Sequence, residues 1–324
     1  MDAVVVREFG PAENMHLESV ADPSPGPGAV RVAVESAGVH VVDTRIRTGR
    51  PIGPFPVPEL PYIPGREVVG AVDSVGASGD QHLLGRRVAV SLGNANGGYA
   101  TLAVAPAAHL HVIDPTLDAA TAATMVGTGR TAVGLLHLAA VTADDTVLIT
   151  AAAGGIGTLV VQRLHDVGAH VVALAGGPEK TELVRKLGAD LAVDYRDPGW
   201  DAQVRSAGLR PTVLLDGVGG APGRRAVALL APGARLLSYG NVAGDLGLSD
   251  ADLVDRRVMT VSALGPGGGF TPANIFRWAD EALESATRGQ LRASVTRFPL
   301  AEAATAHARL EDRSTTGKVV LDVD

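Results

Sequence analysis

The stretch from Thr146 to Gly157 reads TVLITAAAGGIG and decides the fold of this chain. Its first five residues are typical of a fully buried strand, and apolar residues recur at helical spacing from Ile156 to Val167. Glycines between a strand and a helix let backbone N–H groups approach a phosphate, and the helix N-terminus adds partial positive charge. The stretch therefore predicts a site for the pyrophosphate of a dinucleotide. The alternative is a tight structural turn, because Val160 stands where the dinucleotide fingerprint has Gly or Ala.

Strand and helix patterns alternate from about residue 120 onward. The expected strands are 146–150, 170–175, 191–193, 212–216, 235–240 and 258–264. The expected helices are 156–167, 179–187, 221–230 and 249–256. Strands that alternate with helices form a parallel sheet covered on both faces, so we expect an α/β, doubly wound fold here.

The first third of the chain has a different texture, with short strands broken by Gly and Pro. The segment 51–64 carries too many prolines for a helix or a central strand, and is expected to be a lid over a cleft or an irregular surface loop. The last part of the chain has a sequence pattern similar to that of the first third and is expected to pack with it in one domain. We therefore expect one domain from residues 1–121 with 266–324, and a dinucleotide-binding domain from 122–265.

Composition narrows the possible functions. The 324 residues are 46% hydrophobic and 19% charged, which is typical of a folded globular protein. The chain has no cysteine, so disulfides, thiolate metal sites and a Cys nucleophile are excluded. The net charge of −7 argues against nucleic acid as the main partner. We see no export signal and expect a cytoplasmic protein. The stretch 119–141 contains Arg130 and is expected to form a core helix, not a membrane span.

The cofactor preference depends on the end of the second expected strand. Proteins that prefer NAD usually carry Asp or Glu there, to accept a hydrogen bond from the ribose 2′-hydroxyl. This strand ends in Ala175 and Gly176, and Lys180 follows on the next helix. A small pocket beside a cation suits a 2′-phosphate, so NADPH is the expected cofactor. The alternatives are that Lys180 is an ordinary solvated residue and that Glu179 serves NAD.

Six segments, taken in order along the chain, resemble the medium-chain dehydrogenase/reductase superfamily and its zinc-independent quinone oxidoreductase branch. They are 43–49 (DTRIRTG), 64–70 (PGREVVG), 98–100 (GYA), 151–157 (AAAGGIG), 193–196 (VDYR) and 238–241 (SYGN). The resemblance covers nearly the whole chain. It implies a Rossmann cofactor domain and a mainly β, GroES-like catalytic domain.

The chain also departs from the superfamily's patterns. Zinc alcohol dehydrogenases of the superfamily carry Gly-His-Glu with an upstream Cys, whereas this chain has Arg66 at the His position and no Cys. A guanidinium is not a metal ligand, so we expect no catalytic metal. The quinone oxidoreductase branch often has Asn where this chain has His40, and Tyr where it has Arg45. These two differences put the usual quinone specificity in doubt.

The resemblance implies roles for fourteen cofactor-binding residues. The pyrophosphate would be held by Gly154, Gly155, Ile156 and Gly157, and the adenosine 2′-phosphate by Gly176, Lys180 and Tyr195. The remaining residues would lie along strand ends or near the nicotinamide: Thr131, Val218, Gly240, Asn241, Leu264, Gly265 and Lys318. The alternative for Thr131 is a hydroxyl bonded to its own helix backbone.

Hydride transfer without a metal needs an acceptor such as a quinone or an enone, in which the charge moves onto a conjugated oxygen. The protein then stabilises that oxygen and supplies a proton. His40 and Asp43 are the candidates, because residues three apart share one face of a helical turn. The alternative is that Asp43 caps a short helix and His40 lines the pocket. Arg45 and Arg66 favour an anionic substrate, or are surface or salt-bridge residues.

The expected function is that of an NADPH-dependent, metal-free reductase of a quinone or an α,β-unsaturated ketone. One alternative is an enoyl reductase of a biosynthetic, polyketide-type intermediate. Another is an NADPH-binding protein with a structural or RNA-binding role and no turnover. The family also suggests a homodimer paired through the apolar strand 258–264. We expect a small-molecule substrate and no membrane or nucleic-acid partner.

Overall fold

The computed structural model describes the whole chain except residues 52–54, 78–79, 262, 264–267 and 324. The chain forms two compact units, Met1–Arg130 with Ala279–Asp324, and Thr131–Trp278. Both divisions fall later in the chain than the expected boundaries after residues 121 and 265. α2 (Ala119–Thr124), which contains the first expected boundary, packs on strands of the first unit. The second division falls within α9 (Pro272–Thr287), which contributes residues to both units.

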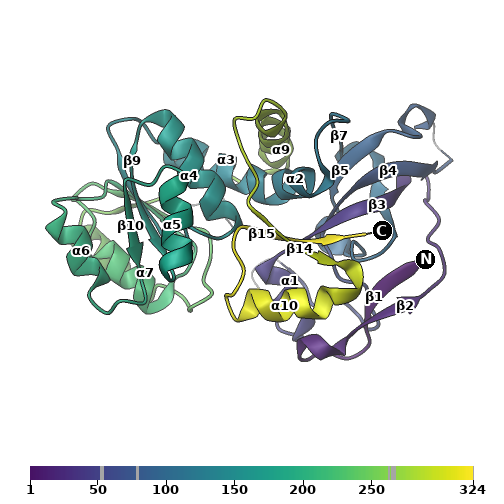
Figure 1. The fold of residues 1–324 in the computed structure, drawn as a ribbon, viewed down its shortest axis with the longest axis horizontal. Coiled ribbons are helices and arrows are strands. Elements are labelled where there is room, and N and C mark those ends of the chain that lie inside the picture. The colour runs from purple at the N-terminus through teal and green to yellow at the C-terminus, as the bar shows by residue number, and fades with distance from the viewer. Residues whose placement is uncertain (52–54, 78–79, 262, 264–267, 324) are drawn as a thin grey trace. The chain divides into compact units, whose positions relative to one another are not determined.

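A parallel sheet of six strands forms the centre of the second unit, in the order β10-β9-β8-β11-β12-β13 (Figure 1). Its strands are β8 (Thr146–Ile149), β9 (His170–Ala175), β10 (Leu191–Asp194), β11 (Val213–Asp216), β12 (Arg235–Ser238) and β13 (Met259–Thr260). All five pairings are parallel. This order, with the first strand central, is that of a doubly wound dinucleotide-binding sheet, so the predicted fold class is confirmed.

Helices follow the strands in alternation and cover both faces of this sheet (Figure 1). They are α3 (Arg130–Ala139), α4 (Gly155–Val167), α5 (Pro178–Lys186), α6 (Trp200–Ser206), α7 (Gly220–Val227) and α8 (Asp250–Asp255). Sequence analysis missed α6, whose Trp200 is buried in the core of this unit. The expected strand 258–264 is shorter in the structure, and part of it lies outside the described residues. Met259 is on the edge strand and is 56% exposed.

The first unit is mainly β. Its larger sheet runs β14-β15-β3-β4-β5-β7, with β6 also paired to β3, and β1 pairs with β2. The strands are β1 (Asp2–Val6), β2 (Met15–Ser19), β3 (Ala29–Val39), β4 (Glu67–Val75), β5 (Arg87–Ser91), β6 (Leu102–Pro106), β7 (Leu110–Val112), β14 (Val295–Pro299) and β15 (Lys318–Asp322). The helices are α1 (Val41–Arg47), α2, α9 and α10 (Ala303–Glu311). The described residues of 51–64 form no helix and no strand, as their prolines predict.

The segment 119–139 is helical throughout, with a π-helical turn at Met125–Gly129 between α2 and α3. Asp118 caps α2 by accepting from the backbone N–H groups of Ala120 and Thr121. Within the described residues, no helix is both long enough and apolar enough to cross a membrane.

Candidate active site

The glycine-rich turn after β8 is tightly closed at the N-terminus of α4. Ala151 has a positive φ of 52°, and the first helical bond of α4 runs from the Thr158 N–H to the Gly154 carbonyl. The N–H groups of the first turn of a helix have no acceptor within that helix and are available to a phosphate. A Cβ on Gly157 would lie 2.5 Å from the carbonyl oxygens of Ala151 and Ala152. Only glycine fits there, so the turn is closed too tightly for any side chain.

A buried carboxylate holds this end of the sheet together. Asp216 ends β11 and is fully buried, and its Oδ1 accepts from the Thr150 hydroxyl at 2.8 Å. The same carboxylate accepts from the backbone N–H groups of Val218 and Gly219. Thr150 in turn accepts from the N–H of Gly217 at 2.9 Å. This network links the glycine-rich turn to the loop after β11.

The loops after β11 and β12 lie against each other at the carboxyl ends of the strands. The Ala243 N–H donates to the carbonyl of Val218, and a Cβ on Gly240 would collide with the carbonyl of Gly217. The structure therefore brings Val218, Gly240 and Asn241 together at the edge where doubly wound folds bind ligands. The Asn241 side chain is exposed and donates to Asp245 at 3.1 Å.

The three residues predicted to contact the 2′-phosphate lie after β9 and after β10. A Cβ on Gly176 would lie 2.7 Å from the Tyr195 hydroxyl, so Gly176 and Tyr195 are neighbours. Lys180 lies in the first turn of α5 and is half-buried. Arg196 contacts Gly177 closely enough to exclude a Cβ there. Arg196 pairs with Asp194 at 3.3 Å and is a further cation near this strand end, which sequence analysis did not single out.

A second cluster lies within the first unit and is made by strand register. His40 follows β3, and β15 pairs with β3 so that Val319 is opposite Val39, which places the preceding Lys318 beside His40. The pairing of β3 with β4 sets Val68 opposite Ala37, which places Glu67 beside Gly38. A Cβ on Gly38 or Gly127 would overlap the Glu67 carboxylate. These two glycines therefore leave the space that the buried carboxylate occupies.

Three polar atoms of this cluster lie within hydrogen-bond distance of one another. Glu67 Oε1 is 2.9 Å from His40 Nε2 and 2.5 Å from Lys318 Nζ, and Lys318 Nζ is 3.0 Å from His40 Nε2. Glu67 and Lys318 are almost fully buried, whereas the His40 side chain is 26% exposed. Burial alone would raise the pKa of Glu67, but the charges and hydrogen bonds of His40 and Lys318 outweigh it and hold that pKa at about 2.

Asp43 does not contact the cluster in the way that the spacing predicted. His40 precedes α1 as its N-cap, so the two residues do not share a face of a helical turn. The Asp43 carboxylate instead accepts from the backbone N–H of His40 at 2.8 Å. This is the capping alternative, and the His40 ring is oriented by Glu67. Burial raises the pKa of Asp43.

The buried side chain of His307, which contacts Tyr99, leads us to predict that the free energy of unfolding depends on pH. Tyr99 Oη is 3.0 Å from His307 Nε2, and burial, with a smaller contribution from the charge of Arg47, lowers the pKa of His307 from 6.5 to about 3. In the unfolded chain His307 is therefore protonated below about pH 6.5, whereas in the folded chain it stays neutral down to about pH 3. Folding stability should fall as the pH falls through this window, by about 1.4 kcal/mol per pH unit from this group.

The measurement is chemical denaturation of the wild type and of His307→Gln between pH 7 and 5. The variant should lose less of its free energy of unfolding across this range, because glutamine does not titrate. Equal slopes in the two proteins would remove His307 as the cause.

Arg66, the residue before Glu67, has two defined partners. Arg66 stacks over the ring of Phe55, with its Cζ 4.1 Å from the centroid, and donates to Asn94 at 2.9 Å. Burial lowers the pKa of Arg66 and of Arg130, and their charges act on Glu67. Arg45 lies half-buried in α1. Sequence analysis missed Glu67 as a neighbour of His40, because the contact depends on pairing between distant strands.

The donor set around Glu67 does not fit a catalytic metal. The carboxylate is already paired with Lys318 and His40, and Arg66 occupies the adjacent position with a group that is not a metal ligand. Within the described residues, no three His, Cys, Asp or Glu side chains are grouped so as to hold a metal ion. A cation at Glu67 would face the ammonium of Lys318.

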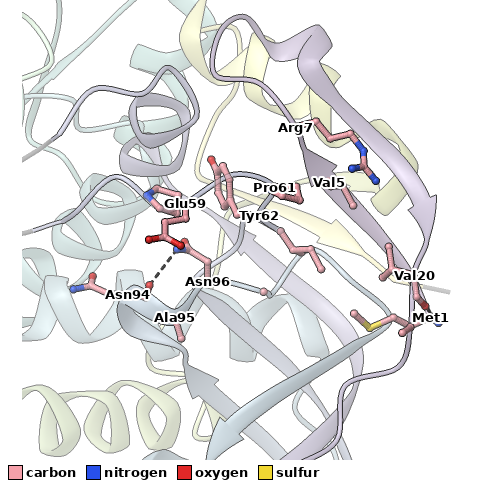
Figure 2. Close-up of a pocket in the computed structure, with 14 residues that line it drawn as sticks. Met1, Val5, Arg7, Val20, Glu59, Pro61, Tyr62, Asn94, Ala95 and Asn96 are labelled. Atoms are coloured by element: carbon pink, nitrogen blue, oxygen red, sulfur yellow. Dashed lines mark hydrogen bonds between the residues drawn. The ribbon is translucent and has the colours of Figure 1, made fainter.

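A separate cavity of about 540 Å³ lies in the first unit, and Figure 2 shows the residues that line it. Its walls come from β1 with its flanking residues, from the two residues after β2, and from the segments 58–63 and 94–97. Asn96 donates to the backbone carbonyl of Asn94 at 3.2 Å within it. Among the residues described as lining it, none belongs to the His40 cluster, and its link to that cluster runs through the hydrogen bond from Arg66 to Asn94.

The other predicted cofactor residues divide between the two units. Thr131 lies in α3 at the start of the second unit, and Lys318 belongs to the first. Leu264 and Gly265 lie outside the described residues.

Two family models match the chain. The alcohol dehydrogenase GroES-like domain matches residues 26–115, and the zinc-binding dehydrogenase domain matches residues 155–280. The chain is 31% identical over 320 residues to the quinone oxidoreductase of Pseudomonas aeruginosa, with 97% of both chains covered. It is 32% identical over 339 residues to the 2-haloacrylate reductase of a Burkholderia species, with 99% and 98% covered.

Two further comparisons bear on cofactor and substrate. The structure of mycobacterial Rv1454c complexed with NADPH has a TM-score of 0.87 and 30% identity, with 99% of both chains covered. The phthioceranic/hydroxyphthioceranic acid synthase of Mycobacterium tuberculosis is 30% identical over 98% of this chain, which corresponds to 15% of that larger protein.

Proposed function

Because the chain belongs to the medium-chain dehydrogenase/reductase superfamily, we propose that it is an NADPH-dependent reductase that delivers a hydride, without a metal, to a quinone or an α,β-unsaturated ketone. The observation that carries the proposal is the closed glycine turn at the start of α4, because the first N–H groups of a helix have no acceptor within it and suit a pyrophosphate. Relatives named quinone oxidoreductase and 2-haloacrylate reductase support the reaction class.

NADPH would be held by residues of the second unit and would supply the hydride when bound. Gly154, Gly155, Ile156 and Gly157 would bind the pyrophosphate. Gly176, Lys180 and Tyr195 would surround the 2′-phosphate, with Arg196 as an additional cation. A relative of similar fold that was crystallised with NADPH supports this choice over NADH.

The chemistry is proposed to be metal-free because the position used by a metal ligand in zinc dehydrogenases is Arg66. With no metal, the negative oxygen of the reduced substrate needs protein donors. His40 is the partly exposed member of its cluster, and we assign it as the residue that donates a proton to that oxygen. Asp43 then acts by capping α1 and fixing the backbone of His40.

Replacing Lys180 by Ala is expected to raise the Michaelis constant for NADPH about tenfold or more and to change that for NADH little. The reason is that a charge-assisted hydrogen bond to the 2′-phosphate is absent with NADH. Lys186→Ala is the matched control, because Lys186 is exposed at the other end of α5. Equal changes for the two cofactors in Lys180→Ala would refute the assignment and favour Glu179 as a partner of NAD.

The alternative substrate is an enoyl thioester of the polyketide type. The observation in its favour is that the chain matches a segment of a mycobacterial acid synthase along nearly its whole length. Arg66 and Arg45 also suit a substrate with a negative group, such as a 2-haloacrylate.

The test is NADPH consumption by the purified protein with quinones, enones, 2-haloacrylates and enoyl thioesters. Turnover of quinones or enones above the other classes supports the proposal, and preferential turnover of enoyl thioesters supports the alternative. Binding of NADPH with no turnover on any acceptor would contradict the reductase assignment and favour a non-enzymatic role. The homodimer and the cytoplasmic location stay predictions.

A further inference from the structure

α1 and α10 lie side by side in the first unit (Figure 1), and their polar side chains meet. Asp43 and Arg47 are four residues apart on α1, so they share one face of that helix. His307 and Glu311 share one face of α10 for the same reason. Arg47 Nη2 donates to Glu311 Oε1, which joins the two faces.

Tyr99 joins the same two faces about one helical turn away from this ion pair. Its hydroxyl is 3.0 Å from His307 Nε2 and 3.4 Å from Asp43 Oδ2. The region between the helices is therefore bounded at one end by Tyr99 and at the other by the pair of Arg47 and Glu311.

Unpartnered polar atoms gather in this region. Among the described residues, eight buried side-chain N and O atoms have no hydrogen-bond partner, and five of the eight belong to residues of this region. They are Asp43 Oδ1, Arg47 Nε, Arg47 Nη1, Tyr62 Oη and His307 Nδ1. Buried polar groups are normally hydrogen-bonded, so five unpartnered atoms in one place point to a bound ligand.

Tyr62 belongs to this region although it also lines the separate cavity. Its hydroxyl is buried and has no partner among the described residues. Burial raises the pKa of Tyr62, and the charges of Asp43 and Arg47 both act on it, so the hydroxyl lies near both helix residues. Tyr62 therefore forms a side wall of the region between α1 and α10.

The chemistry of the five atoms selects the ligand. Arg47 Nε and Nη1 only donate hydrogen bonds, and Asp43 Oδ1 accepts them. An anion would be repelled by Asp43, and a cation would be repelled by Arg47. The His307 ring adds no charge, because burial lowers its pKa to about 3. Water is neutral and both donates and accepts, so it fits this mixed set.

We propose that α1, α10 and Tyr62 enclose a hydration site whose buried waters bridge Asp43 and Arg47. Five atoms exceed the roughly four hydrogen bonds that one water makes, so the site takes about two waters or more. Asp43 also accepts from the backbone N–H of His40, so these waters position His40 by holding the Asp43 carboxylate. The inference rests on the proposed function only for the effect on turnover.

The sign of the stability change in Tyr62→Phe tests for the waters, and chemical denaturation measures it. If the hydroxyl bonds to a buried water, its removal should raise the equilibrium constant of unfolding about fivefold. If the hydroxyl has no partner, its removal should leave stability unchanged or increase it. Tyr99→Phe is the control, because it loses its contact with His307 and should be destabilised in either case.

The waters can also be observed directly. A crystal structure should show ordered waters within hydrogen-bond distance of Asp43 Oδ1 and Arg47 Nη1, and oxygen-17 relaxation dispersion should count them as long-lived waters in solution. Arg47→Met should remove about one water or more, because it removes three N–H donors. Glu311→Gln is the matched control, because it removes the charge of the ion pair and leaves those donors in place.

Turnover reports on the positioning of His40. Arg47→Met should lower kcat about tenfold, because Asp43 loses its support, and should leave the Kd of NADPH within about twofold. If Arg47→Met does not fold, Tyr62→Phe carries the test of the waters.

Either a crystal structure in which the five atoms contact no water, or a Tyr62→Phe protein as stable as the wild type, would overturn the inference. Bound waters with unchanged kcat in Arg47→Met would contradict the positioning of His40. A protein with no turnover on any acceptor would contradict the proposed function, whereas the stability of Tyr62→Phe and the count of waters would still decide whether the hydration site exists.

Discussion

Replacing Gly157 by Ala is expected to weaken NADPH binding about 100-fold. The added Cβ would lie 2.5 Å from two backbone carbonyl oxygens, a distance that real Cβ atoms do not adopt, so the turn must move. The N–H groups at the start of α4 would then lose their alignment with the pyrophosphate. Loss of two hydrogen bonds to a charged group, at about 1.5 kcal/mol each, corresponds to this factor.

The control is Gly199→Ala, at the N-cap of α6 in the same unit. The nearest atom to a Cβ there is 3.5 Å away, which is ordinary contact. This variant should bind NADPH like the wild type. Calorimetry gives the dissociation constants, and circular dichroism reports whether each variant is folded. A folded Gly157→Ala protein with unchanged affinity would show that the turn does not hold the cofactor.

Replacing Asp216 by Ala is expected to lower the free energy of unfolding by about 3 kcal/mol or more. The carboxylate is fully buried and accepts from Thr150, Val218 and Gly219. Its removal leaves these buried donors without an acceptor, and each unmet donor costs about 1–3 kcal/mol. Chemical denaturation of the wild type and the variant measures the difference.

Two further variants make the Asp216 experiment specific. Asp245→Ala removes an exposed carboxylate with one hydrogen bond in the same unit, and should change stability by about 0.5 kcal/mol or less. Asp216→Asn keeps an acceptor oxygen and should fall between the two. A loss in Asp216→Ala no greater than that in Asp245→Ala would mean that the network does not support the site.

The cofactor unit was largely predictable because its signals are local. The run from Thr146 to Ile149 is short and apolar, so it identifies a buried strand, and the glycines after it mark the start of α4. The short elements of this unit were harder to predict from the sequence. The helix α6 is only seven residues long, with one buried aromatic as its main signal, and β13 is two residues long.

The His40 cluster was only half predictable because it depends on strand register. The spacing of His40 and Asp43 predicts a shared helical face, but the helix begins one residue after His40, and the Asp43 carboxylate accepts from the His40 backbone N–H. Lys318 and Glu67 are far apart in the sequence and meet His40 only because β15 and β4 both pair with β3. β3 pairs with three strands, β15, β4 and β6, and local sequence patterns do not predict which strands pair with it.

The most direct test of the account is calorimetric titration of the purified protein with NADPH and with NADH. The account predicts saturable binding of NADPH at one site per chain, at least about tenfold tighter than NADH, because the 2′-phosphate gains charge-assisted hydrogen bonds. No binding heat with either dinucleotide at several temperatures, or equal affinity for the two, would contradict it.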